Sequence, residues 1–380
     1  MSIRIGILGS RGIPNHYGGF EQLAEQLSYG LVSKGHEVFV YNSHNHPYSR
    51  KTWNGVHIIH CYDPEYLMGS SGQFIYDLNC ILDSRARKFD VILVLGYTSS
   101  SIWGRLLPRD SVIIFNMDGL EWQRNKYSGN ARRFLHYAEK LAVKYSDFYI
   151  SDSPVIQTYY LNKYKLPTEY IAYGAKLTTK ENIDILHAFG VEPYRYFILI
   201  ARMEPENQIE AVLDGYAVSN TDCRFLVVGN MGNAYGKRLI KKFHQDKRIH
   251  FTGALFDEKT THSLRLYSKL YFHGHSSGGT NPSLLEAMAS RCLIVAHNNP
   301  FNRSVLEEDA LYFSTGSDIK FLIEQFKPGP LEEQMVSRNL EKIRTKYNWE
   351  NVTGHYERFM LQCCYLHANE NIPDKQYVYE

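Results

Sequence analysis

A glycine-rich turn at residues 278–280 runs into a stretch with the features of a helix start. Asn281 is the expected N-cap and Pro282 the expected first helical residue. Backbone N–H groups at such a start carry partial positive charge and suit a diphosphate. Glu286 lies one turn further on, where its carboxylate would accept hydrogen bonds from sugar hydroxyls. The segment predicts a cradle for a nucleotide-linked ligand, and a capped structural helix is the alternative.

An arginine follows one of the strand-like runs of the second half of the chain, Tyr196–Ile200. At the carboxyl end of that strand, the guanidinium of Arg202 would clamp phosphate oxygens and neutralise a leaving diphosphate. The alternative is a surface arginine paired with Glu204 or Glu206.

A long loop, residues 9–21, follows the first strand-like run and ends in a glycine pair. Gly18 and Gly19 would let the backbone approach a phosphate or sugar closely, and a plain flexible loop is the alternative. The glycines at 6, 9 and 12 do not have the G-x-G-x-x-G spacing of dinucleotide binders, so a dehydrogenase is disfavoured.

Carboxylates also follow a strand of the first half. Asp118 or Glu121 would bind an acceptor hydroxyl or act as a base, and a turn-forming Asp-Gly is the alternative. Basic and aromatic residues then alternate over residues 122–144: Trp122, Arg124, Lys126, Tyr127, Arg132, Arg133, Phe134, Tyr137, Lys140 and Lys144. Such a surface would suit anionic lipid or a lipid-linked diphosphate. An ordinary solvated helix face fits equally well.

Composition excludes several classes. The 42 lysines and arginines nearly balance 40 acidic residues, and a net charge of +2 argues against a nucleic-acid binder. The six cysteines have no C-x-x-C or metal-ligand spacing, which favours a reduced cytosolic interior. No Asp-x-Asp pair occurs, and the histidines at 44, 46, 57 and 60 form no recognised metal site. We therefore expect neither a metal nor a cofactor.

The chain begins directly with the strand-like run Ile3–Leu8, without a secretory leader. No run of about 18 apolar residues predicts a membrane-spanning helix. We expect a cytoplasmic protein, with peripheral attachment to the inner face of the cell membrane left open.

Short apolar runs alternate with amphipathic stretches in both halves, which is typical of parallel sheets with covering helices. The predicted strands are Ile3–Leu8, Glu37–Tyr41, Val56–Cys61, Val91–Leu95, Val112–Phe115, Phe148–Ser151, Tyr196–Ile200, Arg224–Val228, Ile249–Thr252, Leu270–His273 and Leu293–Ala296. Helices are predicted at about 20–31, with Gly35 as a C-terminal cap, and at 131–145, 208–218 and 282–290. Residues 174–193 lack strong periodicity and form the expected linker. The pattern predicts an α/β protein of two doubly wound, Rossmann-like halves facing across a cleft.

Together these segments resemble the family 4 glycosyltransferases of the GT-B fold over nearly the whole chain. The resemblance depends on the Gly18-Gly19-Phe20-Glu21 loop, Arg202, the glycine turn before Glu286 and the late Tyr347-Asn348-Trp349-Glu350. Four sequence motifs are similar to those of a bacterial subgroup of rhamnosyltransferases with an N-terminal domain of unknown function. They are Gly-Ile-Pro-Asn-His-Tyr-Gly-Gly-Phe-Glu, Met-Asp-Gly-Leu-Glu-Trp, Glu-Pro-Glu-Asn and Gly-Gly-Thr-Asn-Pro-Ser-Leu-Leu-Glu-Ala-Met.

The resemblance implies metal-independent transfer of a sugar from a nucleotide diphosphate donor, with retention of configuration. Residues 1–173 would bind the acceptor, residues 174–348 the donor, and 349–380 would form a helix crossing back to the first domain, with a tail. The implied catalytic residues are Arg202, Asp118 and Glu286. Donor-binding residues would be Gly18, Gly19, Arg202, Asn207, Gly278, Gly279, Thr280, Asn281 and Glu286. Acceptor-binding residues would be His16, Asp118, Glu121 and Arg124.

Three positions depart from the family pattern. Asn207 stands where a lysine is common five residues after the arginine, and Gly278 replaces the first of two glutamates. Asp118 stands in place of a histidine. A modified pocket of this kind suits a 6-deoxy sugar, so dTDP-L-rhamnose is the expected donor and a glycan or lipid-linked oligosaccharide of the bacterial cell surface the expected acceptor. A nucleotide-sugar epimerase or phosphorylase of the same fold, or a non-catalytic scaffold of a polysaccharide assembly complex, are the alternatives.

Overall fold

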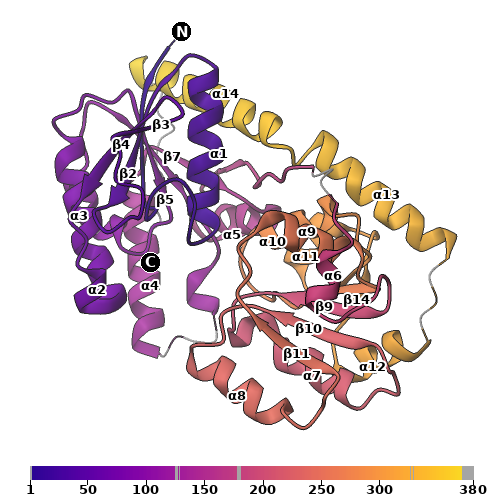
Figure 1. The fold of residues 1–380 in the computed structure, drawn as a ribbon. Helices are drawn as coiled ribbons and strands as arrows, with labels where there is room; N and C mark the ends of the chain where they lie inside the picture. The colour runs from indigo at the N-terminus through magenta and orange to yellow at the C-terminus, as the bar shows by residue number, and fades with distance from the viewer. Residues whose placement is uncertain are drawn as a thin grey trace. The chain divides into compact units, whose positions relative to one another are not determined.

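The computed structural model describes residues 2–369 apart from 125, 126, 128, 178–180, 326 and 328, and the chain forms two compact units. The N-terminal unit comprises Met1–Gln123, Tyr127–Tyr173 and Trp349–Glu380. The C-terminal unit comprises Arg124–Lys126 and Gly174–Asn348. Each unit contains its own sheet (Figure 1).

The sheet of the N-terminal unit has eight strands in the order β3-β4-β2-β1-β5-β6-β7-β8. Its pairings are parallel except for the antiparallel pair β3–β4. Without its two short edge strands, the order is that of a doubly wound fold and reverses direction between β1 and β5. The strands are β1 (Arg4–Leu8), β2 (Glu37–Ser43), β3 (Thr52–Trp53), β4 (Val56–Cys61), β5 (Val91–Leu95), β6 (Val112–Asn116), β7 (Phe148–Ser151) and β8 (Glu169–Tyr170).

Helix α1 of this unit has one apolar face: Leu23, Leu27 and Leu31 are buried at helical spacing. The α-helices are α1 (Gly19–Ser33), α2 (Glu65–Met68), α3 (Gly72–Ser84), α4 (Gly129–Tyr145), α5 (Pro154–Tyr164) and α14 (Trp349–Ala368). The 3₁₀ helices are η1 (Gly69–Ser71), η2 (Ser100–Leu106) and η3 (Glu121–Gln123).

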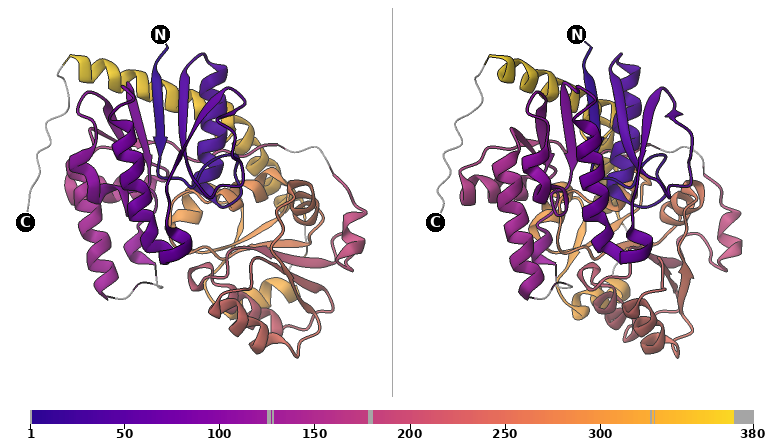
Figure 2. Two further views of the ribbon diagram at one scale, coloured as in Figure 1. Left: turned by 60° about the vertical axis from the view of Figure 1, so that its left-hand side comes forward. Right: turned by 90° about the vertical axis from the view of Figure 1, so that its left-hand side faces the viewer.

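Helix α14 packs within the N-terminal unit although it follows the C-terminal unit in sequence. It contacts α1 and β6, and the yellow α14 lies beside the indigo α1 in the views of Figures 1 and 2. Asn116 Nδ2 donates to Tyr356 Oη at 3.1 Å, and His36 Nε2 lies 3.1 Å from Glu357 Oε1. The N-terminal unit is therefore built from both ends of the sequence.

The sheet of the C-terminal unit has six parallel strands in the order β11-β10-β9-β12-β13-β14. Its order reverses between β9 and β12, as in other doubly wound sheets. The strands are β9 (Tyr196–Ile200), β10 (Arg224–Val228), β11 (Ile249–Gly253), β12 (Leu270–His273), β13 (Ile294–His297) and β14 (Leu311–Phe313). The helices are α6 (Ile185–Ala188), η4 (Pro205–Asn207), α7 (Ile209–Ala217), α8 (Ala234–Phe243), α9 (Glu258–Leu266), α10 (Pro282–Ala289), α11 (Pro300–Leu306), α12 (Gly316–Gln325) and α13 (Pro330–Thr345).

Most of the predicted elements are confirmed. Six predicted strands have the predicted bounds, including Val56–Cys61 and Leu270–His273. The sequence analysis missed β3, β8 and β14, which have only two or three residues and so carry little periodicity. The predicted linker 174–193 is not entirely irregular, because it contains the short helix α6, while its residues 178–180 lie outside the described part of the chain.

Candidate functional site

The carboxyl ends of β9 and β12 lie side by side where the strand order of the C-terminal unit reverses. In doubly wound sheets, ligands bind in the crevice outside the strands at this point. The segments that leave these two ends, residues 201–208 and 274–281, contain Arg202 and the glycine turn. The topology therefore brings together the two parts of the predicted donor site.

The glycine turn leads into a capped helix, as predicted. Asn281 is the N-cap of α10, with its Oδ1 accepting from Ser283 N at 2.9 Å, and Pro282 is the first helical residue. Ser283 Oγ is 3.0 Å from Tyr271 Oη and donates to Ile200 O at 3.4 Å, which ties the helix start to the end of β9. The turn has a fixed position relative to the strand that precedes Arg202.

Arg202 is exposed at the end of β9. The alternative pairing with Glu204 or Glu206 is not found among the described residues. Its backbone oxygen accepts from Asn207 Nδ2 at 2.7 Å and from Glu204 N at 2.8 Å, so the loop is closed through the main chain. The guanidinium is therefore placed where an anionic ligand can reach it.

Glu286 has a partner that the sequence analysis did not identify. Arg265 Nη2 donates to Glu286 Oε2 at 2.8 Å and to Ser283 Oγ at 3.2 Å. The Arg265 side chain is 5% exposed and that of Glu286 is 37% exposed. A buried cation thus fixes the orientation of the carboxylate that was predicted to accept hydrogen bonds from the donor.

Asn207, predicted to bind the donor, is buried. Its Oδ1 lies 2.8 Å from His275 Nδ1. His275 was not among the predicted site residues. Gly278, which precedes the capped helix, has φ of +119° and lies against the His275 ring, since a Cβ on it would be 2.9 Å from Nε2.

A buried carboxylate, Glu206, was assigned no binding role by the sequence analysis. Its side chain is 3% exposed, and neither carboxylate oxygen has a hydrogen-bond partner among the described residues. Arg124 Nη1 is 3.7 Å from Glu206 Oε1, too far for a hydrogen bond. The prediction had Arg124 bind the acceptor from the first domain; the structure groups it with the C-terminal unit.

The N-terminal unit has its own switch point, between β1 and β5. Gly18 is the N-cap of α1 and Gly19 its first residue. Glu21 is buried, and its Oε1 accepts from Arg11 N at 2.7 Å, which folds the loop back on the helix start. The loop after β1 is consequently held in place near its glycine pair.

Asp118 follows β6 and has φ of +49°, the left-handed conformation that suits an Asp-Gly turn. Asn116 Oδ1 accepts from its N–H at 3.1 Å. Burial, with further contributions from Glu139, Glu121 and Asp118, raises the pKa of Tyr97 well above its usual value. Both predicted acceptor carboxylates, Asp118 and Glu121, therefore contribute to the raised pKa of Tyr97.

His16 is an exposed residue of the loop after β1, and its ring meets the His46 ring edge-on at 4.4 Å. Burial and the neighbouring His16 lower the pKa of His46 to about 4. His46 is therefore neutral at physiological pH.

The basic segment forms one face of α4. Arg132, Arg133, Lys140 and Lys144 are exposed, as is Tyr137, whereas Leu135 and Ala138 are buried. Lys126 and two neighbours of the predicted 122–144 segment lie outside the described residues. The helix thus has a basic, partly aromatic outer face.

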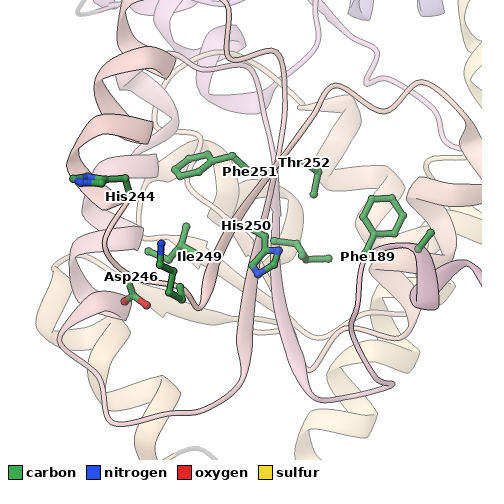
Figure 3. A pocket seen from close by; sticks show the side chains of 10 residues that line it. Phe189, His244, Asp246, Ile249, His250, Phe251 and Thr252 are labelled. Carbon is green, nitrogen blue, oxygen red and sulfur yellow. The ribbon is translucent and has the colours of Figure 1, made fainter.

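A shallow hollow lies at one edge of the C-terminal sheet, on the edge strand β11. Figure 3 shows its lining side chains, among them Phe189, His244 and Thr252. No predicted site residue lines it. This hollow is therefore separate from the switch point of the same unit.

Two negative findings concern the described residues alone. Among them, no three His, Cys, Asp or Glu side chains are grouped so that they could hold a metal ion. None of the helices in the described part of the chain is both long and apolar enough to cross a membrane.

Two families match consecutive parts of the chain. Residues 3–176 match a domain of unknown function, DUF1972, and residues 186–335 match the family described as Glycosyl transferases group 1. A comparison with curated protein sequences gives no significant match.

Many solved structures share the fold of the chain. A sucrose-phosphate synthase from Thermosynechococcus elongatus has a TM-score of 0.78 at 16% identity, covering 97% of this chain and 100% of its own. Anabaena HepE, solved in complex with UDP-glucose, has a TM-score of 0.72 at 14% identity, with 95% and 100% coverage. The α,α-trehalose 6-phosphate synthase of Burkholderia multivorans has a TM-score of 0.72 at 11% identity, with 98% of both chains covered.

At such identities the likeness to these structures establishes the fold, while the sequence match over residues 186–335 bears on activity. The two doubly wound units and these comparisons identify the protein as a glycosyltransferase of the GT-B fold that resembles family 4.

Proposed function

We propose that the protein is a retaining glycosyltransferase that moves L-rhamnose from dTDP-L-rhamnose onto a glycan or lipid-linked oligosaccharide in the synthesis of a bacterial surface polysaccharide. The observation that carries the donor assignment is the convergence of Arg202 and the Asn281-capped glycine turn at the β9–β12 switch point. A helix start and a guanidinium are both suited to a diphosphate. The HepE complex with UDP-glucose supports a nucleotide sugar as the ligand class.

In this proposal the diphosphate lies on the turn, and the nucleotide extends toward Glu286. Because Arg265 fixes one oxygen of Glu286, the carboxylate is oriented before a ligand arrives. Such preorganisation lowers the cost of binding hydroxyl groups. Arg202 would then contact the phosphate that becomes the leaving group.

The chemistry follows from where charge develops. As the bond between the sugar carbon and the diphosphate oxygen breaks, negative charge grows on the diphosphate. Arg202 and the N–H groups at the start of α10 would stabilise this charge without reorganising. The departing phosphate would accept the proton of the acceptor hydroxyl, which attacks from the same face of the sugar. No step in this scheme needs a metal ion.

The acceptor is assigned to the N-terminal unit, with Asp118 and Glu121 as the groups that would bind its hydroxyls. Asp118 is the candidate for orienting the acceptor, because it lies in a turn at the carboxyl end of β6 and can accept a hydrogen bond from an acceptor hydroxyl. The basic face of α4 supports a cytosolic protein that rests on an anionic membrane surface and meets a lipid-linked acceptor there.

A thermal-shift screen of nucleotide sugars tests the donor assignment, since a ligand that binds only the folded protein raises the midpoint of unfolding. We expect the largest shift with dTDP-L-rhamnose, and smaller shifts with UDP and GDP sugars. A larger shift with one of those sugars would reassign the donor. No shift with any nucleotide sugar would contradict the proposal as a whole.

Gly279→Glu is the matching variant. A carboxylate on the turn would repel the diphosphate, so the shift with dTDP and with dTDP-L-rhamnose should disappear while the unliganded midpoint changes little. Normal donor affinity in this variant would exclude the turn as the diphosphate site. Product analysis with donor alone separates transfer from epimerisation, because an epimerase needs no acceptor. Donor binding without any turnover would favour a scaffold.

A further inference from the structure

The two departures from the family pattern in the donor domain, Asn207 and Gly278, meet at one residue. His275 lies between them: its Nδ1 is 2.8 Å from Asn207 Oδ1, and its Nε2 faces Gly278. Asn207 is 68 residues from His275 in sequence, and the two meet because β9 and β12 are neighbours in the sheet. We propose that His275 is a specificity residue whose Nε2 accepts a hydrogen bond from a hydroxyl of the donor's glycosyl ring. This inference rests on the proposed nucleotide-sugar donor.

The contacts of Asn207 determine which His275 nitrogen carries the proton. Asn207 Nδ2 donates to Arg202 O at 2.7 Å, so the amide oxygen is the atom that faces His275. A carbonyl oxygen can only accept, so Nδ1 must be the protonated nitrogen. In a neutral imidazole the other nitrogen, Nε2, is then a hydrogen-bond acceptor.

The surroundings keep the imidazole neutral. Removal from water, followed by the charges of His273, Arg124 and Arg202, lowers the pKa of His275 well below its usual range. The ring therefore presents a lone pair, which attracts a hydroxyl and disfavours contact with an ionised phosphate oxygen.

Gly278 leaves the lone pair accessible. Within the described part of the chain, Nε2 has no hydrogen-bond partner. Any side chain at Gly278 would start 2.9 Å from Nε2, and φ of +119° would strain it in addition. A residue larger than glycine at this position would therefore cover the acceptor nitrogen.

The backbone of His275 is held as firmly as its ring. Its carbonyl oxygen accepts from Asn299 Nδ2 and from Asn302 Nδ2, each at 2.9 Å. A Cβ on the preceding residue, Gly274, would lie 2.1 Å from Asn207 O, so only glycine permits this approach of the two segments. Polar groups held in this way lose little entropy on binding, which is what a specificity contact requires.

The glycosyl ring is the part of the donor that fits Nε2. His275 precedes the turn assigned to the diphosphate, and Glu286, assigned to the nucleotide, follows it. A donor laid across the turn would therefore place its nucleotide toward Glu286 and its sugar toward His275. Asn207 is in this scheme a positioning residue, since it acts through the imidazole.

The first test compares wild type with His275→Phe, which keeps a planar ring without the acceptor. With dTDP-L-rhamnose, or the nucleotide sugar preferred in the thermal-shift screen, we expect kcat/KM to fall about 10- to 100-fold. The dissociation constant for dTDP alone should stay within about twofold. His250→Phe, on the edge strand β11, is the matched control and should behave like wild type.

Donor analogues that lack one ring hydroxyl sharpen the test. Wild type should turn over one analogue, the one that lacks the hydroxyl bound by Nε2, more slowly than the full donor. His275→Phe should turn over that analogue and the full donor equally well, and its preference among the remaining analogues should match that of wild type. Equal effects of the variant on dTDP and on the sugar nucleotide would place His275 on the nucleotide and overturn the inference. So would unchanged turnover of every donor by the variant. If wild type itself binds no nucleotide sugar, the proposed function fails first.

The role of Asn207 has a spectroscopic readout that does not depend on activity. In protein labelled with ¹⁵N-histidine, the His275 signals should show protonated Nδ1 and unprotonated Nε2. Asn207→Leu should abolish this pattern and reduce turnover, whereas Asn207→Asp retains an acceptor and should keep Nδ1 protonated. A wild-type spectrum with protonated Nε2 would contradict the assignment, whatever the kinetics show.

Discussion

Arg265 and Glu286 form an ion pair across two helices of the C-terminal unit, with Nη2 and Oε2 2.8 Å apart. The guanidinium is almost completely buried and the carboxylate is partly exposed, so one end of the pair belongs to the core and the other faces solvent. A buried arginine can therefore orient the exposed carboxylate that we propose as a donor-binding group.

Arg265→Ala should weaken both the fold and donor binding. The substitution leaves a cavity and removes the group that orients Glu286, and we expect a loss of about 2–4 kcal/mol in the free energy of unfolding. Urea denaturation measures this loss, and calorimetry with dTDP should show weaker binding under conditions where the variant is folded. Arg291→Ala, which breaks an exposed pair with Glu181, is the control and should cost less than about 1 kcal/mol. If Arg265→Ala lowered the free energy of unfolding by no more than Arg291→Ala does, the buried pair would have no structural role.

Arg202→Ala should act on catalysis and leave stability almost unchanged. Its exposed guanidinium has no ion-pair partner to lose among the described residues, so we expect a change in unfolding free energy within about 0.5 kcal/mol. A charged hydrogen bond to the leaving diphosphate is worth about 2–3 kcal/mol, or roughly 30- to 150-fold in kcat/KM. Steady-state kinetics with the preferred donor measure the effect. Unchanged turnover would exclude Arg202 from the reaction.

Asp77→Asn should stabilise the protein at high pH. Asp77 is buried on α3, and Ser99 Oγ donates to its Oδ2 at 2.5 Å, while no described residue bonds to its Oδ1. Burial and the nearby Asp63 raise its pKa to about 7, although Ser99 and Arg11 act in the opposite sense. The folded state therefore holds a proton that the unfolded state releases near pH 4, and stability is lost as pH rises from about 4 to 7. Asparagine does not titrate, so its advantage should grow from pH 5 to pH 8 and reach roughly 1–3 kcal/mol.

Urea denaturation at the two pH values measures this difference. Asp83→Asn, on the same helix, is the control. Although burial acts in the opposite sense, hydrogen bonds from Arg87 and Tyr41 lower the pKa of Asp83. Both pH values lie above its titration, so this variant should be destabilised equally at each. An equal effect of Asp77→Asn at pH 5 and pH 8 would exclude a raised pKa.

The outer face of α4 should determine binding to anionic membranes. We expect the protein to sediment with phosphatidylglycerol vesicles and not with phosphatidylcholine vesicles, and less so as salt increases. Each basic residue near such a surface contributes about 1 kcal/mol, so Arg132→Gln combined with Arg133→Gln should weaken binding about 30-fold. The double variant Lys237→Gln, Lys241→Gln on the exposed face of α8 is the control. If both double variants lost vesicle binding equally, binding would depend on overall charge, and the α4 face would not be the membrane-binding surface.

The sequence predicts those parts of the fold that depend on local pattern. Buried parallel strands such as Val91–Leu95 are continuous apolar runs, and the Asn281-Pro282 helix start depends only on neighbouring residues. The relations missed by the sequence analysis depend on tertiary packing. Arg265 and Glu286 are 21 residues apart on separate helices, and Asn207 and His275 are 68 apart. No periodicity connects such pairs, because the strand order of the sheet brings them together.

The sequence did contain a signal for His275, in the two departures from the family pattern. Asn207 and Gly278 were each interpreted alone, as a missing cation and a missing carboxylate. Their shared contact with one imidazole becomes visible only when β9 and β12 are known to be neighbours.

The position of α14 has a consequence for how the protein folds during synthesis. The C-terminal unit is almost a single continuous stretch, and its entry and exit at Ala175 and Asn348 are joined as a parallel bridge. The N-terminal unit, by contrast, lacks Tyr356 and Glu357 until the last helix leaves the ribosome. Domains usually complete folding in the order in which they are made. Here the C-terminal unit can complete its fold first, while the side of α1 that α14 covers stays exposed until α14 has been synthesised.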